Sequence, residues 1–159
     1  MTITLKIPEY SDYAHIYPTR FTPEVVYWAD DELHQMSVEE YAENRLWAQN
    51  SGEMFERIIV RDDEPIGTIT ARDFNPSTHQ CVFGIVIADK TNWGHGYGTE
   101  AMKLFLPLLK EEGVKIVILD TYSSNKRAQK CFMHLGFRKM TVYYAPNSGR
   151  FVLRMGVKL

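Results

Sequence analysis

The sequence predicts a single α/β domain with a mixed, mostly antiparallel central sheet and helices on both faces. Two observations lead to this prediction. Residues 81–137 read as strand, glycine-rich turn, helix, strand and helix, which is a βαβ unit followed by one more helix. On either side, short apolar runs separated by turn residues predict antiparallel hairpins. The 159 residues, 45% of them hydrophobic, suffice for one core, so we expect residues 1–159 to form one domain.

The βαβ unit is the clearest part of the pattern. Residues 82–88 form a short, β-branched apolar run, which predicts a buried strand. After the glycines, apolar residues recur at helical spacing as far as Gly113, with Pro107 inside the helix as a source of a bend. Residues 114–120 then predict the second strand of the unit.

The flanking segments supply the rest of the sheet and the first helices. Residues 9–36 are rich in aromatic side chains and contain Pro18 and Pro23, which predicts short, broken helices. Ser37 opens a capping box for a helix that ends near Gly52. Further strands are expected at residues 2–7, 54–61, 65–74, 139–145 and 151–157.

Three glycines at alternate positions, Gly94, Gly96 and Gly98, stand between the first strand and helix of the unit. Glycines allow a left-handed backbone and leave N–H groups open at a helix N-terminus, where an anion binds well. A tight turn without a ligand is the simpler alternative. The pattern lacks the Gly-Lys-Ser/Thr ending of a Walker loop, and its GxGxG spacing is not the GxGxxG of a Rossmann fold.

Two motifs in order resemble those of the GNAT superfamily of acetyl-CoA-dependent N-acetyltransferases. The first, Arg/Gln-x-x-Gly-x-Gly/Ala, is matched by Trp93, Gly96 and Gly98, with tryptophan in the first place. The second, Asn-x-x-Ala-x-x-x-Tyr-x-x-x-Gly-Phe, is matched from Asn125 onward, except that Phe132 replaces the tyrosine. The run WGHGYGTEA is most similar to the ribosomal-protein N-terminal (alanine) acetyltransferase branch. The resemblance is close over about residues 54–145 and weaker before them.

The resemblance implies an acetyl-CoA cosubstrate and no metal. Backbone N–H groups of residues 94–99 would hold the pyrophosphate, and the strand at 85–87 would pair with the pantetheine arm. An N–H near Ile87 would polarise the thioester carbonyl. The acetyl-CoA-binding core would span about residues 80–137, and an acceptor-side segment about residues 8–53. The expected cofactor-binding residues are Ile85, Val86, Ile87, Trp93, Gly94, His95, Gly96, Tyr97, Gly98, Thr99, Asn125 and Phe132.

The residues that transfer protons in relatives are replaced here by apolar ones. Phe132 stands in the place of a tyrosine acid, Ala128 in the place of a serine, and Val82 in the place of a carboxylate. The catalytic residues are therefore left unassigned. Four other candidates have simpler structural interpretations: Asp73, His79, Tyr122 and Cys131.

Charge is distributed unevenly along the chain. The formal net charge is only −2, which predicts no nucleic-acid partner. Residues 1–60 carry four basic and eleven acidic side chains, and residues 61–159 carry fourteen and nine, so the two parts are at −7 and +5. An anionic cofactor on the second part and a cationic amine facing the first would explain the asymmetry. Ordinary solvated helix faces are the alternative explanation.

Cysteine usage and targeting signals bear on the compartment. Cys81 and Cys131 both fall within apolar patterns, which is typical of reduced thiols in a cytoplasmic protein. Neither a signal peptide nor an apolar run of membrane-spanning length is recognisable, so we expect no membrane association.

The function expected from these observations is acetyl transfer from acetyl-CoA to a primary amine by direct attack in a ternary complex. The amine would belong to a protein N-terminus or to a small molecule such as a polyamine or an aminoglycoside. The alternative is a catalytically inactive sensor module that binds CoA or acetyl-CoA, which the apolar residues at the acid and base positions favour. Whether the chain forms a homodimer is left open.

Overall fold

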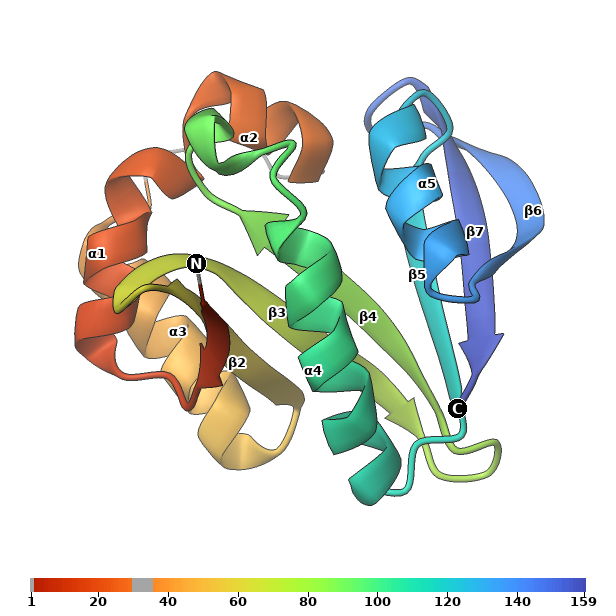
Figure 1. Cartoon of the computed structure of the whole chain (residues 1–159), viewed down its shortest axis with the longest axis horizontal. Helices are drawn as coiled ribbons and strands as arrows, with labels where there is room; N and C mark the ends of the chain where they lie inside the picture. Colours follow the sequence, from red (N-terminus) through yellow and green to blue (C-terminus); the bar gives the residue numbers. More distant parts are fainter. Residues whose placement is uncertain (1, 30–35) are drawn as a thin grey trace.

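A computed structural model describes residues 2–29 and 36–159 and contains one seven-stranded sheet, in the order β1-β2-β3-β4-β5-β7-β6 (Figure 1). Only the β4–β5 pair is parallel, and every other neighbouring pair is antiparallel. The predicted mixed, mostly antiparallel sheet is thus confirmed. The strands are β1 Ile3–Lys6, β2 Met54–Arg61, β3 Glu64–Asn75, β4 Gln80–Ile87, β5 Ile116–Tyr122, β6 Arg138–Ala145 and β7 Arg150–Lys158.

Helices lie on both faces of this sheet. α1 and α3 pack on one face, and α4 crosses the other, where α5 joins the same core (Figure 1). None of the helices in the described ranges is long and apolar enough to cross a membrane. The helices are α1 Tyr10–Arg20, α2 Pro23–Ala29, α3 Val38–Ser51, α4 Tyr97–Glu111 and α5 Lys126–His134, with a short 3-10 turn, η1, at Lys90–Asn92.

The two hydrophobic cores follow from the alternation of side chains along the strands. On β2, Ile59 belongs to the larger core under α4 and α5, whereas Ile58 and Val60 belong to the smaller core under α1 and α3. Phe105 of α4 is fully buried in the larger core, and Tyr13 of α1 is fully buried in the smaller one. A substitution on β2 therefore affects either the core under α4 and α5 or the core under α1 and α3, depending on which face of the sheet the side chain points to.

The first helices agree with the sequence in type, with one addition. Ser37 accepts the Glu40 N–H at 3.1 Å and so caps α3, and Gly52 ends that helix in the left-handed conformation at φ 84°. α1 also begins with a capping box, formed by Glu9 and Asp12, that the sequence interpretation missed. Of the predicted helical stretch 9–36, residues 30–35 lie outside the described residues.

The feature that positions the site is the divergence of β4 and β5. The two strands pair from Gln80 with Ile116 to Phe83 with Leu119. Beyond Phe83 and Leu119 they separate, β4 toward α2 and β5 beside β7 (Figure 1). The sheet therefore opens into a V whose apex lies at Phe83 and Leu119.

Candidate active site

A cleft of about 830 Å³ lies over the opening of the V. The diverging ends of β4 and β5 line it together with the first turn of α4, one side of α5 and the helices α1 to α3. Residues distant in sequence thus meet here: the glycine turn, the second motif and the N-terminal helices. The described residues that line it include eleven of the twelve predicted cofactor-binding residues, His95 being the exception.

The backbone of β4 offers hydrogen-bonding groups to the gap. Ala88 donates its N–H to the Ile66 carbonyl of β3 at 2.8 Å, which makes residues 66 and 88 a hydrogen-bonded pair. Because such pairs alternate in an antiparallel ladder, Val86 also bonds to β3, while Ile85 and Ile87 point their N–H and C=O groups toward β5. Of the three residues expected to pair with the pantetheine arm, Ile85 and Ile87 therefore have backbone groups directed toward the gap, and Val86 does not. The backbone of Val86 is engaged by β3 instead, although all three residues line the cleft.

Trp93 ties the glycine turn to the end of β4. Its indole Nε1 donates to the Ile87 carbonyl at 2.8 Å, so one backbone acceptor in the gap is already used. The Arg127 guanidinium lies over the indole ring, 4.8 Å from its centroid, and brings a positive charge from α5 to the same corner. Trp93 therefore joins β4, the turn and α5.

Two of the three glycines of the turn adopt the left-handed backbone that the sequence predicts, and Gly98 does not. Gly94 and Gly96 have φ of 78° and 82°, and a Cβ added to either would meet nothing within 4 Å. Gly96 is the N-cap of α4, whose 15 residues direct their N-terminal N–H groups and the positive end of the dipole into the cleft. Gly98 packs on β4, since its Cβ would lie 3.7 Å from Ile85 Cδ1. The turn can accept an anion against bare backbone.

His95 lies outside the cleft wall. Its Nε2 is 3.0 Å from the Thr91 carbonyl oxygen, and its ring stacks on Tyr97 with centroids 5.3 Å apart. The side chain is exposed. These contacts hold the shape of the turn. Because the His95 side chain is exposed and outside the cleft lining, it could contact a cofactor only from the solvent side of the turn.

The second motif is a capped helix that packs on the apex of the V. Asn125 accepts the Ala128 N–H at 3.3 Å through Oδ1 and so caps α5. The Phe132 ring packs against Phe83 and Phe137, with centroids 6.5 and 5.9 Å away, and is buried while still lining the cleft. Cys131 Sγ lies 2.8 Å from Thr99 Oγ1 and links α5 to α4.

The proposed proton-transfer candidates separate into two groups. His79 and Asp73 are exposed and do not line the cleft, and His79 precedes β4 at the end remote from the gap. Tyr122 and Cys131 do line it. The second cysteine, Cys81, is buried in the core, and this burial raises the pKa of its thiol to about 11, which makes it unreactive.

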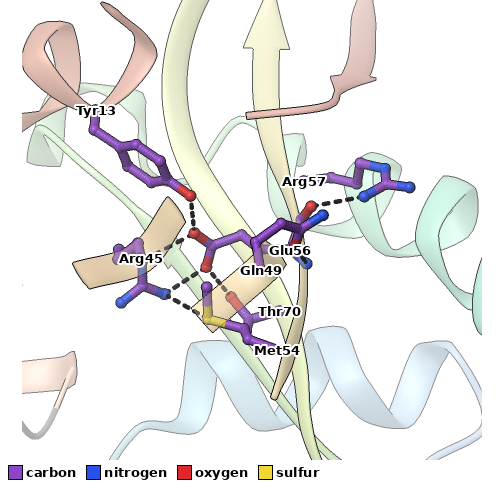
Figure 2. Close-up of polar contacts among 7 residues, drawn as sticks. All are labelled: Tyr13, Arg45, Gln49, Met54, Glu56, Arg57 and Thr70. Carbon is purple, nitrogen blue, oxygen red and sulfur yellow. Dashed lines mark hydrogen bonds and ion pairs between the residues drawn. The ribbon is translucent and has the colours of Figure 1, made fainter. Parts of the chain in front are cut away.

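A buried carboxylate supports the acceptor-side wall of the cleft. Figure 2 shows Glu56, which is fully buried, accepting hydrogen bonds from Tyr13 Oη, Thr70 Oγ1 and the Arg45 guanidinium, whose Nε lies 2.9 Å from Glu56 Oε1. Gln49 Oε1 accepts the Glu56 N–H at 2.7 Å. Burial, and next the nearby Glu56 carboxylate, raise the pKa of Tyr13, so its phenol stays a donor.

This cluster holds three neighbouring side chains of the wall in place. Arg45, Met54 and Thr70 all line the cleft, and Arg45 also contacts the Met54 sulfur at 3.8 Å. The cluster joins α1, α3, β2 and β3 (Figure 2). Its charge is internally balanced, because Arg45 and Glu56 form an ion pair.

The described cleft lining does not carry the expected acidic face. The charged side chains that the first part of the chain contributes to it are Arg20 and Arg45. The one carboxylate of the described lining, Asp120, is bound by Arg154 at 2.9 and 3.0 Å and by the Tyr143 hydroxyl at 3.0 Å. Acidic residues 30–32 lie outside the described residues. The charge asymmetry of the sequence therefore has no counterpart in the described wall of the cleft.

Arg72 is a residue of the cleft that sequence reasoning missed. It lies on β3 and its Nη1 is 3.4 Å from the position that a Cβ on Gly84 would take. The sequence contains a weak signal for it, an arginine on a strand next to one with a glycine, but the contact depends on the register of β3 and β4.

With this geometry established, the family can be assigned. Residues 2–138 match the family model described as acetyltransferase (GNAT) domain. The chain belongs to the GNAT acetyltransferase family. The family resemblance of the two motifs is thus confirmed, and the fold class with it.

Solved structures of the same fold include acetyltransferases for several kinds of amine. Spermidine N-acetyltransferase from Vibrio cholerae, in complex with CoA and spermine, has a TM-score of 0.85 at 15% identity, over 98% of this chain and 95% of that one. Aminoglycoside acetyltransferase AAC(6')-Ib in complex with coenzyme A has a TM-score of 0.81 at 20% identity, over 99% and 95%. RimJ from Mycobacterium smegmatis, in complex with CoA-disulfide, has a TM-score of 0.82 at 17% identity, over 98% and 81%.

We predict that Arg45→Met lowers the free energy of unfolding by about 3–5 kcal/mol, because it leaves the Glu56 carboxylate buried without its cationic partner. Chemical denaturation followed by circular dichroism measures the change. Arg57→Met is the matched control, since Arg57 donates to the backbone carbonyl of Glu56, not to its carboxylate, and packs on Phe55 (Figure 2). We expect that control to lose about 0.5–1.5 kcal/mol. Equal losses in the two variants would contradict the assigned role of the ion pair.

Proposed function

We propose that this protein is an acetyl-CoA-dependent N-acetyltransferase that moves the acetyl group to a primary amine by direct attack in a ternary complex. The observation that carries the proposal is the gap between β4 and β5, which ends at the glycine turn of α4. The gap offers strand-like backbone groups, and the turn offers a helix N-terminus. An acyl carrier that combines amide groups with a diphosphate needs both.

The proposed cofactor site uses these two features in sequence. The pyrophosphate would lie against the backbone N–H groups of residues 94–99, where the bare glycines leave room. The pantetheine amides would pair with Ile85 and Ile87. Arg127, held over Trp93, adds a positive charge beside the phosphates. The residues proposed to form the site are Ile85, Val86, Ile87, Trp93, Gly94, His95, Gly96, Tyr97, Gly98, Thr99, Asn125 and Phe132.

The acceptor is proposed to enter from the face covered by α1, α2 and α3, within the acceptor-side segment of about residues 8–53. Trp28 and Met54 line that side of the cleft together with Thr70. The named substrates of the spermidine and aminoglycoside acetyltransferases, a polyamine and the aminoglycosides, share a primary amine, which supports this acceptor class. We propose that the enzyme is cytoplasmic and that it can form a homodimer.

One observation favours a second candidate function. Val82, Ala128 and Phe132 are apolar at the positions where relatives hold proton-transfer groups, so a module that binds CoA or acetyl-CoA without turnover is the competing proposal. Positioning alone can nevertheless supply a large part of catalysis, about 7–11 kcal/mol of the barrier in well-oriented systems. An enzyme without a general acid is therefore physically sound.

Steady-state release of free CoA thiol in the presence of a panel of amines tests the proposal. The panel comprises spermidine, kanamycin, a free amino acid and peptides with different N-terminal residues. We expect amine-dependent thiol release together with acetylated product. Binding of acetyl-CoA in calorimetry without thiol release for any amine would instead support the sensor module, and failure to bind acetyl-CoA would contradict both.

Gly98→Val is the variant that tests the cofactor site within that experiment. Gly98 lies at an ordinary helical φ and its Cβ would make only a van der Waals contact, so the fold should be retained while the side chain covers the N–H groups of the turn. We expect loss of measurable acetyl-CoA binding. Leu104→Val, a substitution on the half-exposed side of the same helix, is the control and should bind as the wild type does.

Phe132→Tyr tests how the thiolate leaves. The ring lines the cleft next to Phe83, so the added hydroxyl would stand near the apex of the V with little change in volume. General acid catalysis is typically worth about 10²–10⁴-fold, so we expect kcat to rise if protonation of the thiolate limits turnover, while the affinity for acetyl-CoA stays unchanged. A variant with reduced kcat and reduced affinity would show that residue 132 is only part of the core.

A further inference from the structure

If the proposed function holds, with the pyrophosphate at residues 94–99 and the pantetheine along Ile87 and Ile85, the thioester would lie at the apex of the V rather than beside the Ile87 N–H expected from the sequence. The two faces of the apex differ in chemistry. On the side of α4 and α5, the rings of Phe83 and Phe132 cover it, 6.5 Å apart and nearly perpendicular. Neither ring can donate a proton or stabilise a negative charge. These two rings therefore give no assistance to departure of the sulfur from this side of the apex.

Arg72 approaches from the other face of the sheet. In the β3–β4 register Thr70 pairs with Gly84 and Arg72 with Val82, so the four residues share one face of the sheet. Gly84 is the first residue of β4 beyond the last pair with β5. Because Gly84 has no side chain, the Arg72 guanidinium lies across the strand, with Nη1 3.4 Å from the position a Cβ would take. A fixed positive charge thus stands at the apex of the V and lines the cleft.

The charged groups of the described residues near the apex do not form a tight ion pair with Arg72. Arg72 Nε is 3.7 Å from Asp73 Oδ2, a loose contact between two side chains that are 53% and 71% exposed. From β5, Asp120 is bound by Arg154, and from α3, Arg45 is bound by Glu56. Arg20 of α1, on the cleft wall, has interactions of its own. Arg72 differs from Arg45 in having no buried counter-ion among the described residues.

We propose that Arg72 is a catalytic residue that stabilises the negative charge developing on the thioester oxygen and on the departing sulfur. The inference rests on the proposed acetyl transfer. The amine nitrogen attacks the carbonyl carbon and forms the C–N bond. The C–S bond then breaks with its electron pair on sulfur, and the ammonium proton passes to water. Arginine stays protonated and donates several hydrogen bonds, so it supplies charge stabilisation and no proton.

This role of Arg72 explains how the site can work with a phenylalanine at position 132, where relatives have a tyrosine acid. A thiolate with an ordinary pKa near 8.5 can leave as an anion if a cation is close, and a phenolic acid is then dispensable. The ring at position 132 covers one side of the apex and keeps water from that side.

Two measurements on Arg72→Gln and Arg72→Lys test the proposal. For Arg72→Gln we expect kcat to fall about 100-fold, the size typical of losing one oxyanion donor, while the dissociation constant of acetyl-CoA changes less than threefold. Arg72→Lys should recover part of the rate. The second readout is the pKa of the thiol in bound CoA, followed by the ultraviolet absorbance of the thiolate. It should lie below that of free CoA in the wild type and rise in Arg72→Gln.

Arg138→Gln, an exposed arginine on β6 outside the cleft lining, is the matched control and should leave both readouts unchanged. If the wild type acetylates an amine and Arg72→Gln has the same kcat and the same thiol pKa as the wild type, the role of Arg72 is overturned. The proposed function would still stand. A fall in kcat with an unchanged thiol pKa and weaker acetyl-CoA binding would also overturn it, since Arg72 would then only shape the site. Lack of acetylation by the wild type would instead refute the proposed function itself.

Discussion

The divergence of β4 and β5 beyond Phe83 and Leu119 is the constraint on which the rest of the site depends. Each strand follows its other neighbour. β4 stays in register with β3 as far as Ile87, and β5 stays in register with β7 as far as Tyr122. Buried backbone groups need partners, so a sheet that opens in this way must satisfy them by other means. Trp93 satisfies the Ile87 carbonyl, and in the proposed function an extended ligand would pair with the remaining groups.

The two walls of the opening are stabilised by different physics. On the side of α1 and α3, a buried ion pair with two hydroxyl donors around Glu56 joins four elements (Figure 2). On the side of α4 and α5, aromatic packing of Phe83, Phe132 and Phe137 closes the apex. A network of polar groups is specific in geometry, and an apolar cluster excludes water. Both properties suit an acyl transfer in which an amine must reach a thioester before water does.

Local patterns in the sequence were sufficient for the elements and for the glycine turn, because period, capping and glycine chemistry act over a few residues. They could not predict contacts set by register. Glu56 meets Tyr13 across 43 positions, and Arg72 meets Gly84 only because β3 and β4 pair as they do. The parity that turns Ile85 and Ile87, and not Val86, toward the gap follows from the β3–β4 register, as the bond from Ala88 to Ile66 shows. The uneven charge of the two parts of the chain was no guide to the described cleft lining, since net charge counts outward-facing side chains as well.

Amide hydrogen exchange with and without CoA tests the central claim, that the cofactor completes the sheet at the opening of the V. Ile85 and Ile87 face the gap, and Val86 between them already bonds to β3. We predict that CoA slows exchange at the amides of Ile85 and Ile87 and in the turn at residues 94–99, while the amide of Val86 exchanges slowly with or without CoA. Saturating CoA that leaves the exchange of Ile85 and Ile87 unchanged would contradict it.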